Sequence, residues 1–116
     1  MRRVAVPAVL LALLAGMATA SSGSTPHVRF LSADPAKVRG TGFYAGERVR
    51  VTLRWAGVKR VRRVVTTRSG SFTARFAALA GFDRCTDALW VTAVGRRGDH
   101  ARGKLPQPQC PPGLAP

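Results

Sequence analysis

The chain has 116 residues, a net charge of +14 at pH 7 and a sequence pI near 11.9. This length allows one small domain with a thin core, and two histidines with five acidic residues leave little for acid–base catalysis or metal binding. We therefore expect a protein that is not an enzyme and holds no cofactor or metal. Its positive field should attract polyanions such as acidic wall polymers, anionic lipid head groups or nucleic acid.

The first twenty residues have the layout of a secretory signal peptide. Two arginines precede an apolar stretch at 4–14, and small residues at 18–20 provide a cleavage site. The apolar stretch is too short to cross a bilayer. The sequence thus predicts a cleaved signal peptide at 1–20 and a flexible leader at 21–26. The exported chain should be secreted or associated with the cell wall, with no transmembrane span.

Short strands separated by glycine, proline and serine turns are predicted for the rest of the chain, and no helical period is evident. The expected strands are residues 27–31, 37–40 as a short edge segment, 48–55, 58–67, 71–77, 88–94 and 100–105. This spacing favours an all-β fold, an antiparallel β-sandwich of about seven strands over 27–110. A disordered proline-rich tail is expected at 111–116.

The strand at 48–55 is the clearest of these, because apolar and polar residues alternate in it without a break. One face carries Val49, Val51, Leu53 and Trp55, and the other carries Arg48, Arg50, Thr52 and Arg54. A period of two predicts a half-buried strand with an apolar and a cationic surface.

Glycines mark the approach to this strand and the turn that follows it. Gly40, Gly42 and Gly46 are interpreted as a hairpin into the strand, with Phe43 placed to close the bottom of the core. A turn at 56–57 then leads to the next strand.

Cys85 and Cys110 are the only cysteines, and in an exported chain they are expected to form a disulfide. The loop that they close should contribute about 3.5 kcal/mol by the chain-entropy relation. Zinc binding is the weaker interpretation, because no close cysteine pair is present and only His27 and His100 could assist.

The last hairpin allows two registers. A two-residue turn at 97–98 makes the numbers of opposite residues sum to 195, but it leaves Arg102 and Lys104 on the apolar face. A slip to a sum of 196, with a three-residue turn, places Val91 opposite Leu105 and turns both cations outward. We favour the slip.

Two motifs resemble the immunoglobulin-like modules of secreted bacterial proteins. They are Val38-Arg-Gly-Thr-Gly-Phe-Tyr-Ala-Gly-Glu-Arg-Val-Arg-Val and Ser69-Gly-Ser-Phe-Thr. The resemblance is to the IPT/TIG type and, more distantly, to the neocarzinostatin type. It implies an immunoglobulin-like sandwich used for binding or as a spacer. A small-ligand carrier is the alternative, although neocarzinostatin-like proteins have two disulfides and this chain can form one.

Other candidate sites have ordinary structural interpretations. Ser69 and Ser71 flank a turn glycine, which is a hairpin feature, so no catalytic residue is assigned. Asp83 and Asp87 could chelate calcium but are typical of turns. An integrin-type tripeptide, Arg97-Gly98-Asp99, is expected at this composition by chance in about one chain in twenty, and integrin binding is disfavoured.

The basic residues remain the best functional candidates. We expect a polyanion, such as an anionic cell-wall polymer, to bind a set of seven: Arg48, Arg50, Arg54, Lys59, Arg60, Arg62 and Arg63. In an immunoglobulin-like topology the strands at 48–55 and 58–67 are expected in different sheets, so the charge could form a diffuse coat instead. Trp55 and Trp90 are expected in the core, and the chain is expected to be a monomer at the bacterial surface.

Overall fold

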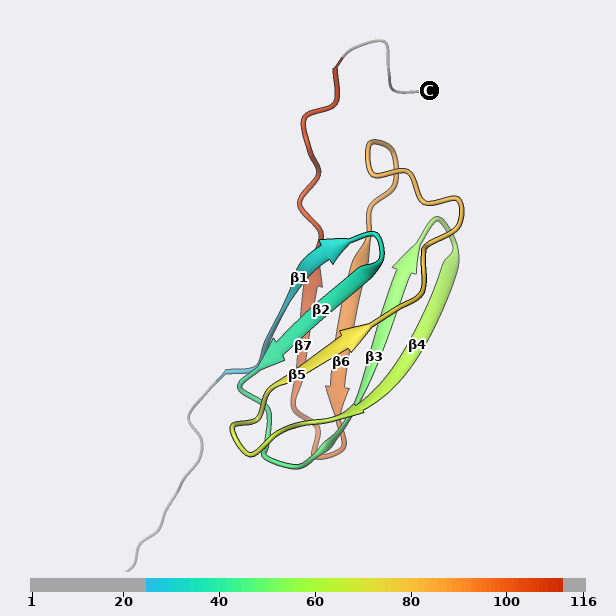
Figure 1. Cartoon of the computed structure of the whole chain (residues 1–116). Helices are drawn as coiled ribbons and strands as arrows, with labels where there is room; N and C mark the ends of the chain where they lie inside the picture. The colour runs from blue at the N-terminus through green and yellow to red at the C-terminus, as the bar shows by residue number, and fades with distance from the viewer. Residues whose placement is uncertain (1–24, 112–116) are drawn as a thin grey trace, which may run out of the picture.

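The computed structural model describes residues 25–111, which form seven strands (Figure 1). The strands are β1 (His27–Ala33), β2 (Ala36–Thr41), β3 (Arg48–Trp55), β4 (Val58–Val65), β5 (Phe72–Arg75), β6 (Trp90–Gly95) and β7 (His100–Lys104). The predicted signal peptide, most of the leader and residues 112–116 of the predicted tail lie outside the described residues. Within residues 25–111 there is no helix long and apolar enough to cross a membrane.

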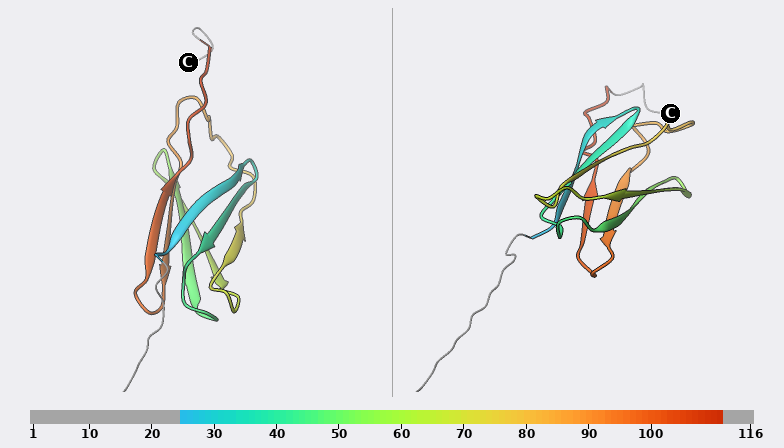
Figure 2. Two further views of the ribbon diagram at one scale, coloured as in Figure 1. Left: turned by 90° about the vertical axis from the view of Figure 1, so that its left-hand side faces the viewer. Right: turned by 60° about the horizontal axis from the view of Figure 1, so that its bottom comes forward.

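The strands form two antiparallel sheets, which can be followed from two further directions in Figure 2. One sheet has the order β1-β2-β5 and the other the order β4-β3-β6-β7. The predicted all-β sandwich is confirmed at this level. Each expected strand is present; β3 has the predicted bounds, and the ends of the other strands differ by one to a few residues.

The core fills the space between the sheets with alternate residues of each strand. In β3 the four inward side chains, from Val49 to Trp55, are at most 3% exposed, as the alternation predicts. The other sheet contributes Val38, Phe72 and Ala74, which are also buried.

The segment at 37–40 was predicted to be a short edge strand, but in the structure it belongs to β2, the central strand of its sheet. It lies between β1 and β5, so both of its edges are hydrogen-bonded. Ala36, Val38 and Gly40 point inward and are fully buried, because the alternation of small or apolar residues with charged ones is complete in this strand. Gly40 provides the space that the Phe72 ring occupies.

The glycine-rich segment after β2 crosses from one sheet to the other, so the predicted hairpin into β3 is wrong. Phe43 in this segment is 6% exposed and packs edge-on against Phe72, with ring centroids 5.4 Å apart. Its predicted place in the core is therefore confirmed.

β3 and β4 form a hairpin through a two-residue turn. Ala56 and Gly57 both have positive φ, 45° and 77°, which is the backbone of a type I′ turn. The expectation that these two strands lie in different sheets is wrong, because such a turn makes its flanking strands pair directly.

The last hairpin has a third register. Trp90 pairs with Lys104 and Val94 with His100, so opposite residue numbers sum to 194 and both predicted registers are wrong. The turn has three residues, as we favoured, but they are 96–98, with Gly98 at a φ of 94°. The register differs from the favoured one by two residues, so Arg102 and Lys104 still point outward.

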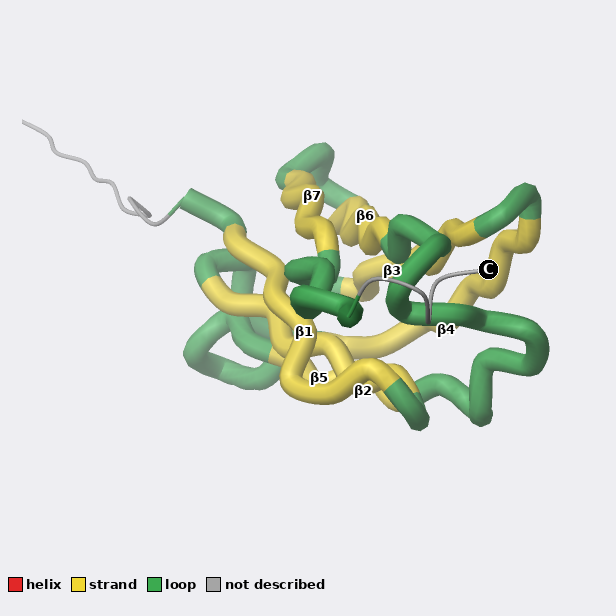
Figure 3. The backbone as a smooth tube through the Cα atoms, turned by 90° about the horizontal axis from the view of Figure 1, so that it is seen from above, coloured by secondary structure: helices red, strands yellow, loops and turns green. Residues whose placement is uncertain are grey.

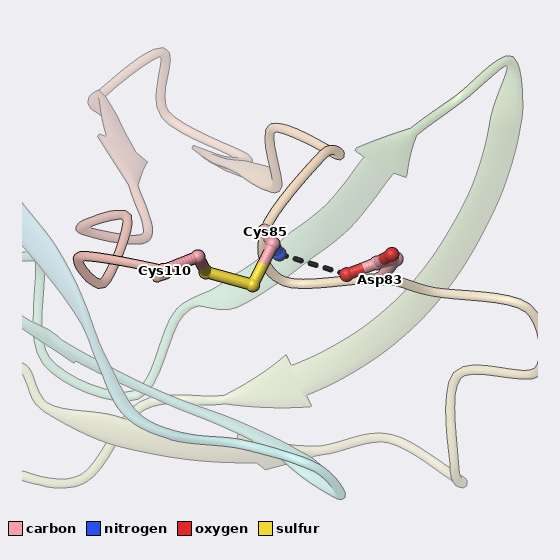
Figure 4. Close-up of a disulfide and its surroundings, with 3 residues drawn as sticks. All are labelled: Asp83, Cys85 and Cys110. Carbon is pink, nitrogen blue, oxygen red and sulfur yellow. Dashed lines mark hydrogen bonds between the residues drawn. A yellow bond between two sulfur atoms is a disulfide. The ribbon is translucent and has the colours of Figure 1, made fainter. Parts of the chain in front are cut away.

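The predicted disulfide between Cys85 and Cys110 is present, with a Cα–Cα distance of 5.9 Å (Figure 4). It joins the loop before β6 to the segment after β7. Asp83 stabilises the same loop, because its Oδ1 accepts the Cys85 N–H at 2.9 Å.

One lateral side of the sandwich is open. Val28 of β1 lies against Gly103 of β7, which brings the two sheets together on that side. β4 lies on the side away from β1 and β7 (Figure 3). Among the inward side chains of β4, Val58 and Arg62 are exposed, whereas Arg60 and Val64 are partly buried.

Candidate polyanion-binding face

The outward side chains of the four-stranded sheet form one continuous surface, here called the basic face. Strand pairing arranges them in rows, because directly paired residues point to the same side of a sheet. Three complete rows are Lys59-Arg54-Trp90-Lys104, Val61-Thr52-Thr92-Arg102 and Arg63-Arg50-Val94-His100, and Val65-Arg48 begins a fourth.

Lysine and arginine dominate this surface, and none of its side chains is acidic. Its cations are Arg48, Arg50, Arg54, Lys59, Arg63, Arg102 and Lys104. Among the five acidic residues of the chain, Asp34, Asp83, Asp87 and Asp99 lie in turns or loops and Glu47 is buried. The positive charge of the basic face is therefore not neutralised by outward side chains of its own strands.

Two of the rows place cations directly opposite each other. Arg50 pairs with Arg63, and Arg54 pairs with Lys59, on neighbouring strands about 4.8 Å apart. Like charges in this position destabilise a sheet by a few tenths of a kcal/mol up to about 1 kcal/mol. An anion between the two cations would remove that cost.

Shallow hollows connect along β3 and β4, and we call this continuous depression the basic groove. A hollow at the β3–β4 turn shares Arg54 and Lys59 with a second one over the middle of the two strands. The second shares Arg50 and Arg63 with a third at the far end. The groove therefore follows the length of β3, with a cation pair at each junction.

The structure divides the seven predicted binding residues into two groups. Five of them lie on the basic face: Arg48, Arg50, Arg54, Lys59 and Arg63. Arg60 and Arg62 lie on the opposite side of β4. The guanidinium of Arg60 is 5.7 Å from the centre of the Trp55 ring and covers this edge of the core.

Arg102 and Lys104 belong to the basic face but were absent from the predicted set. Their alternation with Ala101, Gly103 and Leu105 is the sequence signal that could have identified them, because it places both cations outside in any register that buries Leu105.

Both tryptophans were predicted to lie in the core. Trp55 is buried as expected, but Trp90 is not part of the core. Trp90 is half-buried in the basic face, opposite Lys104. The Arg102 guanidinium lies 4.6 Å and the Lys104 ammonium 5.3 Å from the ring centre, so the indole is held by two cation–π contacts.

The outer face of the three-stranded sheet is also basic but carries fewer cations. They are Arg29, Lys37, Arg39 and Arg75. The charge thus has features of both expected distributions, a concentration on the four-stranded sheet and a thinner coat on the other sheet.

The serine and aspartate candidates bond within their own turns. Thr67, Ser69 and Ser71 form a hydroxyl cluster with oxygen–oxygen distances of 2.9–3.1 Å, which closes the turn before β5. Asp83 and Asp87 accept backbone N–H groups of their own loop through Oδ1 and Oδ2, respectively. Each of these serine and aspartate residues therefore has a structural role in its turn or loop, which was the alternative interpretation to catalysis for the serines and calcium binding for the aspartates.

The tripeptide at 97–99 faces the body of the protein. The N–H of Arg97 donates to Glu47 Oε2 at 3.0 Å, and Asp99 Oδ2 accepts the Tyr44 N–H at 3.2 Å. Burial raises the pKa of Glu47, and a hydrogen bond with Asp99 and charge repulsion from Asp99 raise it further. Hydrogen bonds from the backbone N–H groups of Arg97 and Tyr44 lower this pKa, but the net effect is a raised pKa. Asp99 is thus turned toward Glu47, and its Oδ1 is buried.

Comparisons with protein families, with curated proteins and with solved structures found no match.

Proposed function

We propose that the protein is a secreted, non-catalytic binding module that adheres to an anionic polymer at a bacterial cell surface through its basic face. The observation that carries the proposal is a single sheet surface with seven cations and no acidic side chain. Two opposed cation pairs and a groove along β3 add positions where successive anionic groups could bind.

The proposal includes an immunoglobulin-like fold. Its support is the division of the strands, with the first, second and fifth in one sheet and the third, fourth, sixth and seventh in the other. Export is supported by the disulfide, which is typical of oxidising compartments.

Binding would be driven by charge and by release of counterions. Arginine guanidinium groups fit phosphate, sulfate and carboxylate oxygens in a bidentate manner, and a polyanion displaces its condensed cations when it meets them. Affinity should therefore fall steeply as the salt concentration rises.

Heparin affinity chromatography with two matched variants tests this proposal. The first variant carries Arg50→Gln, Arg54→Gln and Arg63→Gln on the basic face. The second carries Arg29→Gln, Arg39→Gln and Arg75→Gln on the other sheet, with the same loss of net charge. The first should elute at clearly lower salt than wild type and lose about two to three units of the log–log salt slope. The second should elute close to wild type.

Equal shifts for the two variants would show that a diffuse coat, and not the basic face, determines binding. No retention of the wild type at low salt would refute polyanion binding and would leave the spacer interpretation. A small-ligand carrier of the neocarzinostatin type would need a cleft within the sandwich, whereas the hollows along β3 and β4 lie on the surface and core side chains pack between the sheets.

A further inference from the structure

The hollow at the β3–β4 end of the basic groove differs chemically from the rest of the basic face. It lies where the two-residue turn after β3 meets the loop that leads into β6, at the upper end of the molecule in Figure 1. Its volume is about 710 Å3, within the usual range for small-molecule sites. Its lining combines two tryptophans, two cations, a hydroxyl and a carboxylate, provided by Trp55, Trp90, Arg54, Lys59, Thr86 and Asp87.

We propose that this hollow is a subsite for a sugar residue that carries a carboxylate, so that the polymer bound by the basic face is an acidic polysaccharide. The inference rests on the proposed function and names its ligand class.

The indole of Trp90 provides a platform for the ring of the sugar. Arg102 and Lys104 contact the indole from β7, but Trp90 lines the hollow and neither of these cations does. The face of an indole is electron-rich, and the weakly positive C–H groups on one side of a pyranose pack well against it.

The opposed pair Arg54 and Lys59 provides the site for the carboxylate. Both side chains line the hollow and point to the same side of the sheet. A guanidinium binds a carboxylate with two parallel hydrogen bonds, and a neighbouring ammonium adds a third. The bound anion would also remove the repulsion between these two cations.

Asp87 distinguishes a sugar acid from a phosphate. Its Oδ2 accepts the Asp83 N–H at 2.9 Å, which fixes the carboxylate and leaves Oδ1 to accept a hydrogen bond from a ligand hydroxyl. Sugar hydroxyls are donors, and Thr86 beside it can both donate and accept. A phosphate diester group has no donor for this oxygen. The lining therefore favours a monoanionic ring with several hydroxyl groups.

The connection of this hollow to the basic groove favours a polymer over a free sugar. The remaining hollows continue along β3 past Arg50 and Arg63. A chain that starts on Trp90 would place its next acidic groups against those cations.

Tryptophan fluorescence titrations test the subsite. Both tryptophans of the chain line the hollow, but Trp55 is only 3% exposed, so we expect most of the change from Trp90 and use a Trp90 variant to assign it. We expect oligogalacturonate to change the fluorescence, whereas a neutral maltooligosaccharide of equal length should not. Trp90→Thr should abolish the signal and weaken oligogalacturonate binding, measured by calorimetry, by about tenfold. Unchanged far-ultraviolet circular dichroism would show that this variant is folded.

Three further variants add controls. Arg54→Gln should weaken oligogalacturonate binding by about tenfold, whereas the matched Arg48→Gln, at the far end of the same strand, should weaken it by less than threefold. Asp87→Asn keeps an acceptor for the Asp83 N–H, and it should weaken oligogalacturonate binding while it strengthens binding of inorganic polyphosphate.

Several outcomes would overturn the subsite while leaving the proposed function in place. They are heparin retention by the basic face without a Trp90 response to oligogalacturonate, equal effects of Arg48→Gln and Arg54→Gln, or tighter binding of polyphosphate or anionic vesicles than of oligogalacturonate by the wild type. Failure of the wild type to bind any of these polyanions would overturn both proposals.

Discussion

Removal of the disulfide should cost this domain a large part of its stability. Cys85 and Cys110 are 25 residues apart in sequence, and a crosslink over that separation restricts the unfolded chain by about 3.5 kcal/mol at 25 °C. Small domains have about 5–15 kcal/mol in total. The double variant Cys85→Ser/Cys110→Ser should therefore unfold at much lower urea concentration and at a temperature about 14–28 °C lower.

The expected loss of stability can be attributed to the crosslink itself, because the substitutions remove few packing contacts. Both cysteines are only half-buried, and the Asp83 bond to the backbone N–H of residue 85 does not involve the sulfur. Serine is close to cysteine in size, so the core remains filled.

Urea unfolding followed by the fluorescence of the buried Trp55 measures the effect, with circular dichroism as a second probe. Wild type kept in a reducing agent should reproduce the double variant, and both should show a slightly larger m-value, because the unfolded chain without the crosslink is more extended. A loss below about 1 kcal/mol, with coincident transitions from both probes, would refute the chain-entropy reasoning.

Three further predictions concern the core, the turn and the buried carboxyl. Leu53→Ala should cost about 2–5 kcal/mol in urea unfolding, since Leu53 is fully buried, whereas Val61→Ala on the exposed face should cost less than about 0.5 kcal/mol. Gly57→Ala should cost about 1 kcal/mol, because its φ of 77° strains any residue with a Cβ, although the space around it is open. The pKa of Glu47 is raised in the folded protein above the ordinary glutamate pKa of 4.5. At pH values above 4.5 the native state therefore binds more protons than the unfolded state, and the free energy of unfolding falls as the pH rises and Glu47 loses its proton. Glu47→Gln should hence gain stability relative to wild type between pH 4 and pH 7 in parallel melts, and an unchanged difference across that range would contradict the raised pKa.

The parts of the fold that local patterns determine were predicted from the sequence. The bounds of β3 were predicted to the residue, because every second side chain of Arg48–Trp55 enters the core. The disulfide was predicted from the presence of two cysteines together with the layout of a signal peptide. The central position of β2 did not follow, because which strands flank it depends on contacts with β5, more than thirty residues away.

The pairing of the two arginine-rich strands was predicted wrongly, because the expected immunoglobulin-like topology was given more weight than the turn sequence between them. The two-residue turn at 56–57 already indicated that β3 and β4 pair, and this pairing brings Arg50 beside Arg63. Alternation alone places Arg102 and Lys104 outside, but which residues of β6 they face, such as Trp90 opposite Lys104, depended on the register of the last hairpin. That register is set by the position of Gly98 in a three-residue turn, which alternation alone does not determine.

The open lateral edge at β4 has a consequence for self-association. A strand with an unpaired edge is a template for another copy, yet cations project from both of its faces, Lys59 and Arg63 on one and Arg60 and Arg62 on the other. A second β4 brought alongside would meet this charge on each side, and the repulsion would grow as the strands aligned. The cations that we propose to bind a polymer should thereby also hinder neighbouring molecules from joining their sheets at β4.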